Sequence, residues 1–360
     1  MVTGYSRIPY LKGVFEHPEA SKCISRYIHI LKGKLPSRNL LCKTIKVDYS
    51  KDEPLSRLWL KHEQAMEIHR KLERAGDIKI KSKSPSLIDL KREISYRILK
   101  ACVYCERRCE VDRLKGEKGY CRLGIETRVA SAFSHYGEEK ILIPSGTIFF
   151  SSCNFSCVFC QNWDISTRPT AGIEVDGEKL ARIMVNLVSD GCININLVGG
   201  DPTPNLHTIL DALSKLDVNV PIIWNSNLYN SMEAMKLLEG VIDVWLPDFK
   251  YYRDECALKL SKVRKYREVI TRNLRYAYRR GEIILRHLVL PSHLDCCTKP
   301  ILKWISENTP NILVNIMGQY RPEYKAYMYP EINRRPSYDE MHEAFKYAEL
   351  LNLNYRLASY

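Results

Sequence analysis

Short apolar runs alternate with helical apolar patterns along the second half of the chain. Six of the runs are rich in β-branched and aromatic residues, and they cover residues 147–151, 193–198, 221–225, 242–246, 283–290 and 312–317. Between them, apolar residues recur at helical spacing over residues 178–189, 206–216, 232–238, 256–277 and 298–307. This alternation predicts an α/β fold in which helices connect parallel strands. Six such units are too few for an eight-unit barrel, so we expect an open, partial (β/α)6 barrel.

The first hundred residues show a different pattern, which two helices dominate. Apolar residues fall near helical spacing over residues 52–75, and Gly76 is well placed to end that helix. Ser86-Leu-Ile-Asp89 predicts a capping box that opens a second helix. Residues 78–85 are expected to form a strand-like or loose linker between the two. We expect no chemistry in this region, because its cysteines and histidines are isolated: Cys23, Cys42, His62 and His69.

Composition places the chain among folded globular proteins, with 45% hydrophobic and 27% charged residues. No apolar run approaches the roughly 18 residues of a membrane span, and the first residues lack the apolar core of a signal peptide, so a cytoplasmic location is expected. The formal net charge of +13 favours an acidic partner such as RNA or an anionic lipid surface. The basic residues are spread along the chain, however, so we interpret the charge mainly as a solvated surface, and nucleic-acid binding is the weaker expectation.

Three cysteines, Cys153, Cys157 and Cys160, form a C-x3-C-x2-C loop directly after the first predicted strand. Three thiolates can hold three irons of a four-iron, four-sulfur cube, which four cysteines normally hold. The remaining iron is then open to a small molecule, which points to catalysis. The alternative is a structural zinc site completed by a distant ligand, but zinc sites usually pair their cysteines as two C-x2-C arms.

A second cluster lies upstream, where Cys102, Cys105, Cys109 and Cys121 are separated by two, three and eleven residues. Four thiols at this spacing are predicted to close on one metal centre. Both a structural zinc and an auxiliary iron-sulfur cluster stay open, and the uneven spacing favours iron-sulfur. Seven of the 13 cysteines fall in these two clusters, which indicates metal ligation in a reducing compartment rather than a disulfide framework.

Polar residues gather where the predicted strands end. In Val198-Gly-Gly-Asp-Pro202, the glycines let the backbone approach a ligand closely, and Asp201 can accept hydrogen bonds from an ammonium group. Barrel enzymes build their sites at the C-terminal ends of the strands. We therefore expect this turn to share one site with polar residues of the later strands, namely Asn225, Asp248, Lys250 and Arg286. The plainer alternative for Asp248 and Lys250 is an ion pair at a strand end.

The ordered motifs resemble those of a known superfamily. The three-cysteine loop resembles the signature of radical S-adenosylmethionine (SAM) enzymes. Over residues 85–325 the chain is similar to the iron-sulfur proteins related to pyruvate formate-lyase activating enzyme, in Cys-x2-Cys-x3-Cys-x-Val-Asp-Arg, Gly-Thr-Ile-Phe-Phe, Cys-Gln-Asn-Trp, Leu-Pro-Asp-Phe-Lys-Tyr and Met-Gly-Gln-Tyr. The resemblance implies that Cys153, Cys157 and Cys160 hold a [4Fe-4S] cluster that cleaves SAM reductively, and that a 5'-deoxyadenosyl radical abstracts a substrate hydrogen.

The same resemblance implies roles for the other site residues. Phe159 matches the aromatic placed against the adenine, and Gly199-Gly200-Asp201 matches a Gly-Gly-Glu turn that holds the SAM amino group, here with a shorter acidic arm. Asn225, Asp248 and Lys250 match positions at the barrel mouth, where ribose hydroxyls and a carboxylate need partners, and Asp248-Phe-Lys250 resembles the Asp-x-Lys of glycyl-radical activating enzymes. Arg286 matches an arginine near the SAM carboxylate.

The implied partners are SAM, an electron donor such as flavodoxin or ferredoxin, and a substrate. A glycyl-radical protein is the substrate that the family suggests, and a small molecule, lipid or peptide is the alternative. A basic zinc-binding protein that contacts nucleic acid is a more distant alternative, which leaves the three-cysteine loop unexplained. Four regions are expected: a helical N-terminal extension (1–84), a four-cysteine metal module (85–140), the partial barrel (141–325) and a C-terminal helical segment packing on the barrel (326–360).

Overall fold

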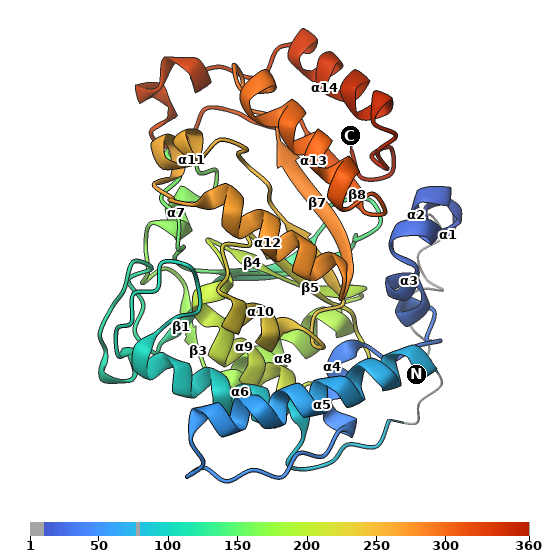
Figure 1. Ribbon diagram of the computed structural model, residues 1–360, viewed down its shortest axis with the longest axis vertical. Helices are drawn as coiled ribbons and strands as arrows, with labels where there is room; N and C mark the ends of the chain where they lie inside the picture. The colour runs from blue at the N-terminus through green and yellow to red at the C-terminus, as the bar shows by residue number, and fades with distance from the viewer. Residues whose placement is uncertain (1–10, 77–79, 360) are drawn as a thin grey trace.

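An open eight-stranded sheet forms the centre of the molecule (Figure 1). The computed structural model describes residues 11–76 and 80–359. The strand order is β3-β1-β2-β4-β5-β6-β7-β8. The strands are β1 (Thr127–His135), β2 (Ser145–Phe150), β3 (Ile173–Val175), β4 (Asn194–Gly199), β5 (Ile222–Ser226), β6 (Val244–Pro247), β7 (Glu282–Leu288) and β8 (Leu313–Met317). Strands β2 and β4 to β8 pair in parallel, and β3 and β8 lie at the two ends of the sheet, which confirms the predicted partial barrel of six parallel strands.

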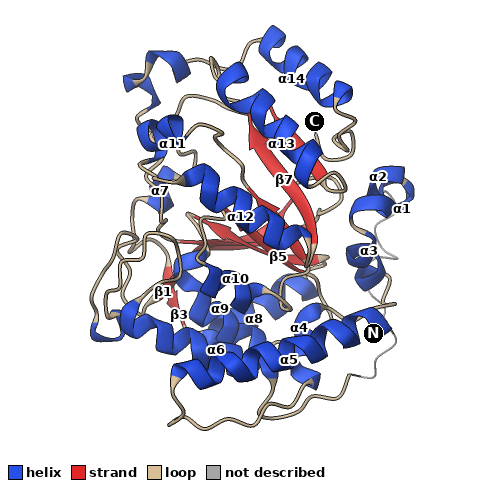
Figure 2. Ribbon diagram, viewed as in Figure 1, coloured by secondary structure: helices blue, strands red, loops and turns tan. Residues whose placement is uncertain are grey.

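Helices connect the parallel strands and cover the outside of the sheet, as Figure 2 shows for α12 and α13 beside β7. The connecting helices are α7 (Trp163–Ser166), α8 (Gly177–Ser189), α9 (Leu206–Lys215), α10 (Met232–Leu238), α11 (Asp254–Ser261), α12 (Tyr266–Tyr278) and α13 (Lys299–Asn308). The prediction of a single helix over residues 256–277 is wrong, because the structure has two separate helices there, α11 and α12. Lys262 and Lys265, between the two helices, adopt positive φ angles of 58° and 50°, which end a helix. The sequence has no glycine or proline there to mark the break.

Two strands were not predicted. β1 pairs antiparallel with both β2 and β3, and so adds an antiparallel edge to the parallel sheet. Its sequence mixes small, polar and apolar residues, and Phe133 in its middle is 43% exposed. A strand covered on only part of its surface lacks the continuous apolar run by which the buried strands were recognised.

The two N-terminal helices that the sequence predicted are confirmed. α5 (Leu55–Ala75) ends at Gly76, which has the positive φ of 78° that favours glycine. α6 (Leu87–Ile98) begins with the predicted capping box of Ser86 and Asp89. Residues 78 and 79 of the predicted linker lie outside the described residues, and residues 80–85 contain neither helix nor strand. The two helices lie side by side along the lower edge of Figure 1.

Four short helices precede them and close the N-terminal end of the barrel: α1 (Leu11–Glu16), α2 (Pro18–Cys23), α3 (Ser25–Leu31) and α4 (Arg38–Thr44). Tyr27 is fully buried, and its hydroxyl accepts a hydrogen bond of 3.0 Å from the side chain of Asn194 at the start of β4. The Arg38 guanidinium donates to the carbonyl oxygens of Ile242 and Asp243, ahead of β6, at 3.0 and 2.8 Å. The extension thus covers the strand ends that face away from the three-cysteine loop.

The remaining elements are short helices and one C-terminal helix, α14 (Tyr338–Leu350), which begins with a capping box. The short helices are η2 (Leu99–Ala101), η3 (Arg113–Lys115), η4 (Thr203–Asn205), η6 (Ala326–Met328), η7 (Pro330–Ile332) and η5 (Leu294–Thr298), which is a turn of π-helix. Across the described part of the chain, no helix combines the length and apolar character needed to cross a membrane. The predicted region boundaries stay a prediction.

Candidate functional site

A cavity of about 220 Å³ opens at the C-terminal ends of the parallel strands. Strands β4, β5, β7 and β8, the loop after β2 and the segment after β6 all contribute residues to it. Its lining includes every barrel residue that the sequence singled out: Cys153, Cys157, Phe159, Cys160, Gly199, Gly200, Asp201, Asn225, Asp248, Lys250 and Arg286. The fold therefore brings these residues, which span more than 130 positions of sequence, to one place, as expected for a barrel enzyme. Their individual roles stay predictions.

Each thiol of the three-cysteine loop has a hydrogen-bond partner. The backbone N–H of Phe155 donates to Cys153 Sγ at 3.3 Å, the Ser261 hydroxyl lies 3.0 Å from Cys157 Sγ, and the Ser166 hydroxyl lies 3.3 Å from Cys160 Sγ. Such donors stabilise thiolates, the form in which cysteine binds metals. Burial nevertheless raises the pKa of Cys153 well above its usual value and that of Cys157 to about 11, so a bound metal, rather than these hydrogen bonds alone, would hold the sulfur atoms as thiolates.

Three thiolates on one metal ion lie closer together than three thiolates on an iron-sulfur cluster. A tetrahedral zinc with Zn–S bonds of about 2.3 Å brings its thiolates to about 3.8 Å from one another. Within the described part of the chain, neither cysteine cluster gathers three thiols within 4.8 Å of one another. A four-iron cube places each thiolate on a different iron and so needs a wider separation. Cys153, Cys157 and Cys160 bring three thiols to one cavity, which is the number that a [4Fe-4S] cluster with one open iron needs.

The Gly199-Gly200 turn packs directly against the end of β2 and the start of the cysteine loop. A Cβ atom on Gly199, whose φ is +131°, would lie 2.2 Å from the backbone of Phe150, and one on Gly200 would lie 1.9 Å from the carbonyl oxygen of Ser152. Both positions therefore require glycine for this internal contact. The sequence interpretation, close approach to a ligand, gave a different reason for the same two residues.

Asp201 is held in place by backbone donors. Its carboxylate accepts hydrogen bonds from the N–H groups of Thr203 at 2.9 Å and Asn227 at 3.0 Å. Burial raises the pKa of Asp201 to about 6, against the opposing effect of these hydrogen bonds. Because each carboxylate oxygen can accept a second hydrogen bond, Asp201 keeps acceptor capacity toward the cavity.

Asn225 offers a donor without a protein partner. It is 4% exposed, and its Nδ2 has no hydrogen-bond partner among the described residues. A buried, unpaired amide is costly, and a ligand oxygen in the cavity would satisfy it. Phe159 lines the same cavity and packs edge-on against Tyr320, with ring centroids 5.7 Å apart. The cavity thus combines an aromatic surface with an unsatisfied donor, which suits a nucleoside.

Asp248 and Lys250 form an ion pair at the mouth of the barrel, with Lys250 Nζ 2.6 Å from Asp248 Oδ2. Burial acts to lower the pKa of Lys250, but Asp248 and Cys157 outweigh it and hold that pKa above its usual range. Lys250 is therefore a fixed positive charge beside the cysteine loop.

Arg286 faces two carboxylates that the sequence interpretation missed. Its Nε donates to Glu139 Oε1 at 2.8 Å, and its Nη2 also contacts Glu138. Asn196 and Asn315 donate to the same two carboxylates from β4 and β8. No sequence signal marks this pair, because adjacent glutamates in a loop normally lie at the surface. The two glutamates therefore hold the Arg286 side chain in place at the wall of the cavity.

The four-cysteine module contacts the three-cysteine loop. Cys102, Cys105, Cys109 and Cys121 line one small cavity of about 20 Å³. Arg107 Nε donates to the carbonyl of Asn154 at 3.0 Å, and Tyr120 Oη donates to Ser156 Oγ at 2.9 Å. The Ser152 hydroxyl donates to the carbonyl of Cys121. The two cysteine clusters are therefore joined by direct hydrogen bonds between their loops.

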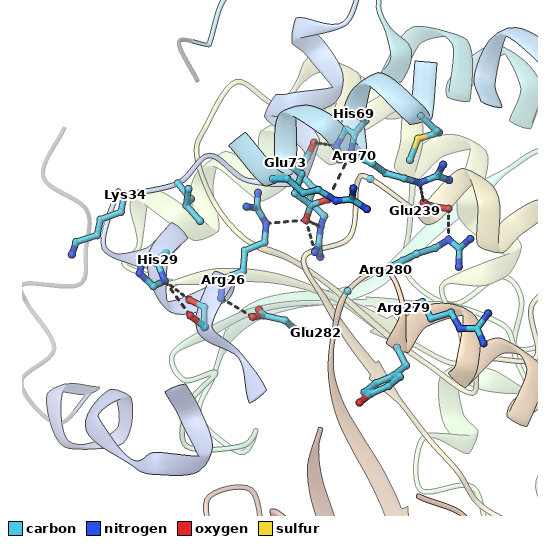
Figure 3. Close-up of a pocket in the computed structure, with 18 residues that line it drawn as sticks. Arg26, His29, Lys34, His69, Arg70, Glu73, Glu239, Arg279, Arg280 and Glu282 are labelled. Carbon is cyan, nitrogen blue, oxygen red and sulfur yellow. Dashed lines mark hydrogen bonds and ion pairs between the residues drawn. The ribbon is translucent and has the colours of Figure 1, made fainter. Parts of the chain in front are cut away.

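A larger cavity, about 950 Å³, lies elsewhere, between the N-terminal extension and the start of β7. Figure 3 shows that charged side chains line it and that many of them pair with one another. Glu239 accepts from Arg70 at 2.8 Å and Arg280 at 3.0 Å, and Glu282 binds the backbone N–H of Arg26. The contacts of Arg70 with Glu239 and of Arg26 with Glu282 join the extension to the barrel. The cysteine loop does not reach this cavity, so we place the chemistry in the smaller one.

Comparison with known proteins gives the following similarities. Residues 147–305 match the radical SAM superfamily. The uncharacterized protein MJ0674 of Methanocaldococcus jannaschii is 45% identical over 343 residues, which cover 92% of this chain and 98% of that protein.

Solved structures show weaker similarity. Streptococcus suis SuiB bound to S-adenosylmethionine matches at a TM-score of 0.45 with 16% identity, covering 83% of this chain and 61% of that one. Methylornithine synthase (PylB) matches at a TM-score of 0.43 with 15% identity, covering 91% and 84%. The matched region thus spans less than two thirds of the SuiB chain.

Proposed function

The chain belongs to the same family as MJ0674 and carries a radical SAM superfamily domain, and from this premise we propose that Cys153, Cys157 and Cys160 hold the [4Fe-4S] cluster of a SAM-dependent radical enzyme. One observation carries the site assignment: the three thiols share a cavity with the Gly-Gly-Asp turn and the polar ends of β5, β6 and β7. A structural zinc ion bound by the three thiols would not need the Gly-Gly-Asp turn or these polar strand ends beside it.

When bound, the cluster supplies a low-potential electron to SAM, which yields an organic radical able to abstract hydrogen from a substrate. The protein's own residues bind and orient. Asn225 Nδ2 offers a hydrogen bond to a ligand oxygen, Asp201 offers acceptor capacity to an ammonium, and Lys250 offers a positive charge toward a carboxylate. Phe159 supplies an apolar wall that helps to exclude water.

The experiment is anaerobic purification followed by iron and sulfide analysis and a dithionite-driven assay for 5'-deoxyadenosine. A Cys157→Ala variant should lose cluster iron and SAM cleavage together. Cys192→Ala is the control, because Cys192 is a buried cysteine beside β1, outside both cysteine clusters. An iron-free protein, or a Cys157→Ala variant that still cleaves SAM, would show that the assignment is wrong.

The second cysteine cluster is included in the proposal as an auxiliary iron-sulfur centre. Its support is the uneven spacing of Cys102, Cys105 and Cys109 along the sequence, together with the cavity that these thiols share with Cys121. Its contacts with the three-cysteine loop suit a route for electrons. A Cys105→Ser variant should therefore lose iron while Cys153, Cys157 and Cys160 keep theirs, and loss of zinc instead would contradict this part of the proposal.

For the substrate, we propose activation of a glycyl-radical protein. The support is Asp248-Phe249-Lys250, the Asp-x-Lys sequence whose side chains pair at the barrel mouth. Incubating the reduced enzyme and SAM with a glycyl-radical protein of the same organism should give a protein-based radical detectable by EPR. Formation of 5'-deoxyadenosine without that radical would point to a small molecule, lipid or peptide substrate.

A further inference from the structure

A third group of metal-ligating side chains lies outside both cysteine clusters. Cys256 comes from the first turn of α11, His293 directly precedes the π-helical turn η5, and Cys296 lies within that turn. One ligand atom from each lies within 4.8 Å of the other two. No other set of cysteine, histidine or acidic residues in the described part of the chain meets this condition.

Cys297 lies beside this group, although its Sγ is not within 4.8 Å of all three ligand atoms. Its Sγ lies 3.8 Å from Cys296 Sγ, which is the separation of two thiolates on one tetrahedral zinc, about 3.8 Å. Cys297 is 1% exposed, and the backbone N–H groups of Tyr252 and Arg253 hydrogen-bond its sulfur. Such donors stabilise a buried thiolate. The widened turn of η5 is what places two consecutive cysteines near the same point.

The histidine is oriented as a metal ligand. His293 Nδ1 donates to the carbonyl oxygen of Pro291 at 2.9 Å, so Nδ1 carries the proton and Nε2 keeps its lone pair. Metal-binding histidines usually donate their second ring nitrogen to a carbonyl or carboxylate in this way. His293 is 7% exposed, so its ring is held in a fixed orientation.

From this geometry we propose that Cys256, His293 and Cys296 bind a structural zinc ion, with Cys297 as the fourth ligand once its side chain turns toward the ion. Three thiolates and one imidazole form one of the usual ligand sets for structural zinc, and such a set leaves no coordination position open for catalysis. The proposal stands independently of the radical chemistry.

The proposed zinc would position the three-cysteine loop through α11. Cys256 lies at the start of this helix, and its last residues contact the loop: the N–H groups of Ser156 and Val158 donate to the carbonyls of Ser261 and Leu260 at 3.2 and 2.9 Å. The zinc would join the start of α11 to the segment after β7. It thereby fixes the helix whose other end carries Ser261 against Cys157.

Zinc content tests the proposal. The anaerobically purified holoprotein should contain zinc, and a Cys256→Ser/Cys296→Ser double variant should lose about one zinc per chain while its iron content stays unchanged. Cys192→Ser is the matched control and should keep the zinc. If the double variant folds, as judged by circular dichroism, and its zinc content equals that of the wild type, the proposal is wrong.

A measurement on the wild type avoids dependence on the variant. Cys256 and Cys296 are partly exposed, so they should react slowly with iodoacetamide while zinc is bound and rapidly after a zinc chelator is added. Labelling of each cysteine is read by mass spectrometry after digestion, with buried Cys192 as the internal control. Equal labelling of Cys256 and Cys296 with and without chelator, or a disulfide between two of these cysteines, would overturn the proposal.

Discussion

The hydroxyl of Ser261 lies 3.0 Å from the sulfur of Cys157 and 2.7 Å from the hydroxyl of Tyr251. Ser261 is the last residue of α11, so a residue about 100 positions away from the cysteine loop contacts its central thiol. The Tyr251 hydroxyl can donate to Ser261 while Ser261 donates to Cys157. This chain of hydroxyl groups links the interior of the barrel to the proposed cluster.

We expect Ser261→Ala to lower the reduction potential of the cluster. A hydrogen bond to a cluster thiolate stabilises the more negatively charged, reduced state, so its removal favours the oxidised state. A difference of about 1 kcal/mol in that hydrogen bond corresponds to about 40 mV for one electron. The potential can be measured by redox titration monitored by EPR. Tyr251→Phe is the matched control, because it keeps the Ser261 hydroxyl and should shift the potential less. Equal potentials in wild type and Ser261→Ala would contradict this expectation.

We expect Asn225→Ala to weaken SAM binding by about tenfold, the loss of one buried hydrogen bond of about 1.4 kcal/mol. The reason is that Asn225 Nδ2 is buried and has no partner among the described residues, so a ligand is its best acceptor. Isothermal titration calorimetry of the cluster-loaded protein with SAM gives the affinity. Asn186→Ala, at an exposed position of α8, should bind SAM as the wild type does. Unchanged affinity in Asn225→Ala would remove Asn225 from the proposed SAM site.

The sequence predicted the parallel strands and the residues at their ends because both are marked by local patterns. Buried parallel strands read as continuous apolar runs, and glycines and cysteines at short spacing are recognisable without knowledge of distant residues. Gly199, Asp201 and Cys153 could therefore be placed together from strand order alone.

What the sequence could not predict depends on contacts between distant segments. Ser261 is an ordinary helix residue until the fold brings it to Cys157, and Glu138 resembles a surface residue until Arg286 pairs with it. The third metal-ligand group was also missed, because Cys256 lies 37 positions before His293 and the Cys-Cys pair that follows has no standard zinc spacing. In each case the signal lies in the tertiary structure.

We expect stability at acid pH to depend on Glu138. Burial alone would raise the pKa of Glu138, but the charge of Arg286 and a hydrogen bond from His135 lower it to about 2. Because this pKa is below that of the unfolded chain, unfolding takes up a proton between about pH 4.5 and pH 2, and the stabilisation present above pH 4.5 is lost across that window. Urea denaturation at stepped pH should show a shallower loss of stability in Glu138→Gln, by up to about 1.4 kcal/mol per pH unit. Glu178→Gln, on the exposed side of α8, is the control, and an unchanged slope in Glu138→Gln would contradict the pairing with Arg286.

We expect Lys91→Met to destabilise the junction between the N-terminal helices and the barrel. Lys91 is fully buried in α6, and its Nζ donates to the carbonyl oxygens of Lys236, Leu237 and Glu239 at the end of α10, at 3.1, 3.2 and 2.8 Å. Methionine fills similar space but leaves these carbonyls without a donor, and an unpaired buried acceptor costs about 1–3 kcal/mol. We therefore expect the free energy of unfolding to fall by about 3 kcal/mol in urea denaturation followed by circular dichroism.

The control is Lys100→Met, at an exposed lysine just beyond α6, which should change the free energy of unfolding by less than about 0.5 kcal/mol. A Lys91→Met variant as stable as Lys100→Met would show that the buried ammonium contributes no net stability, as happens when its desolvation cancels its hydrogen bonds.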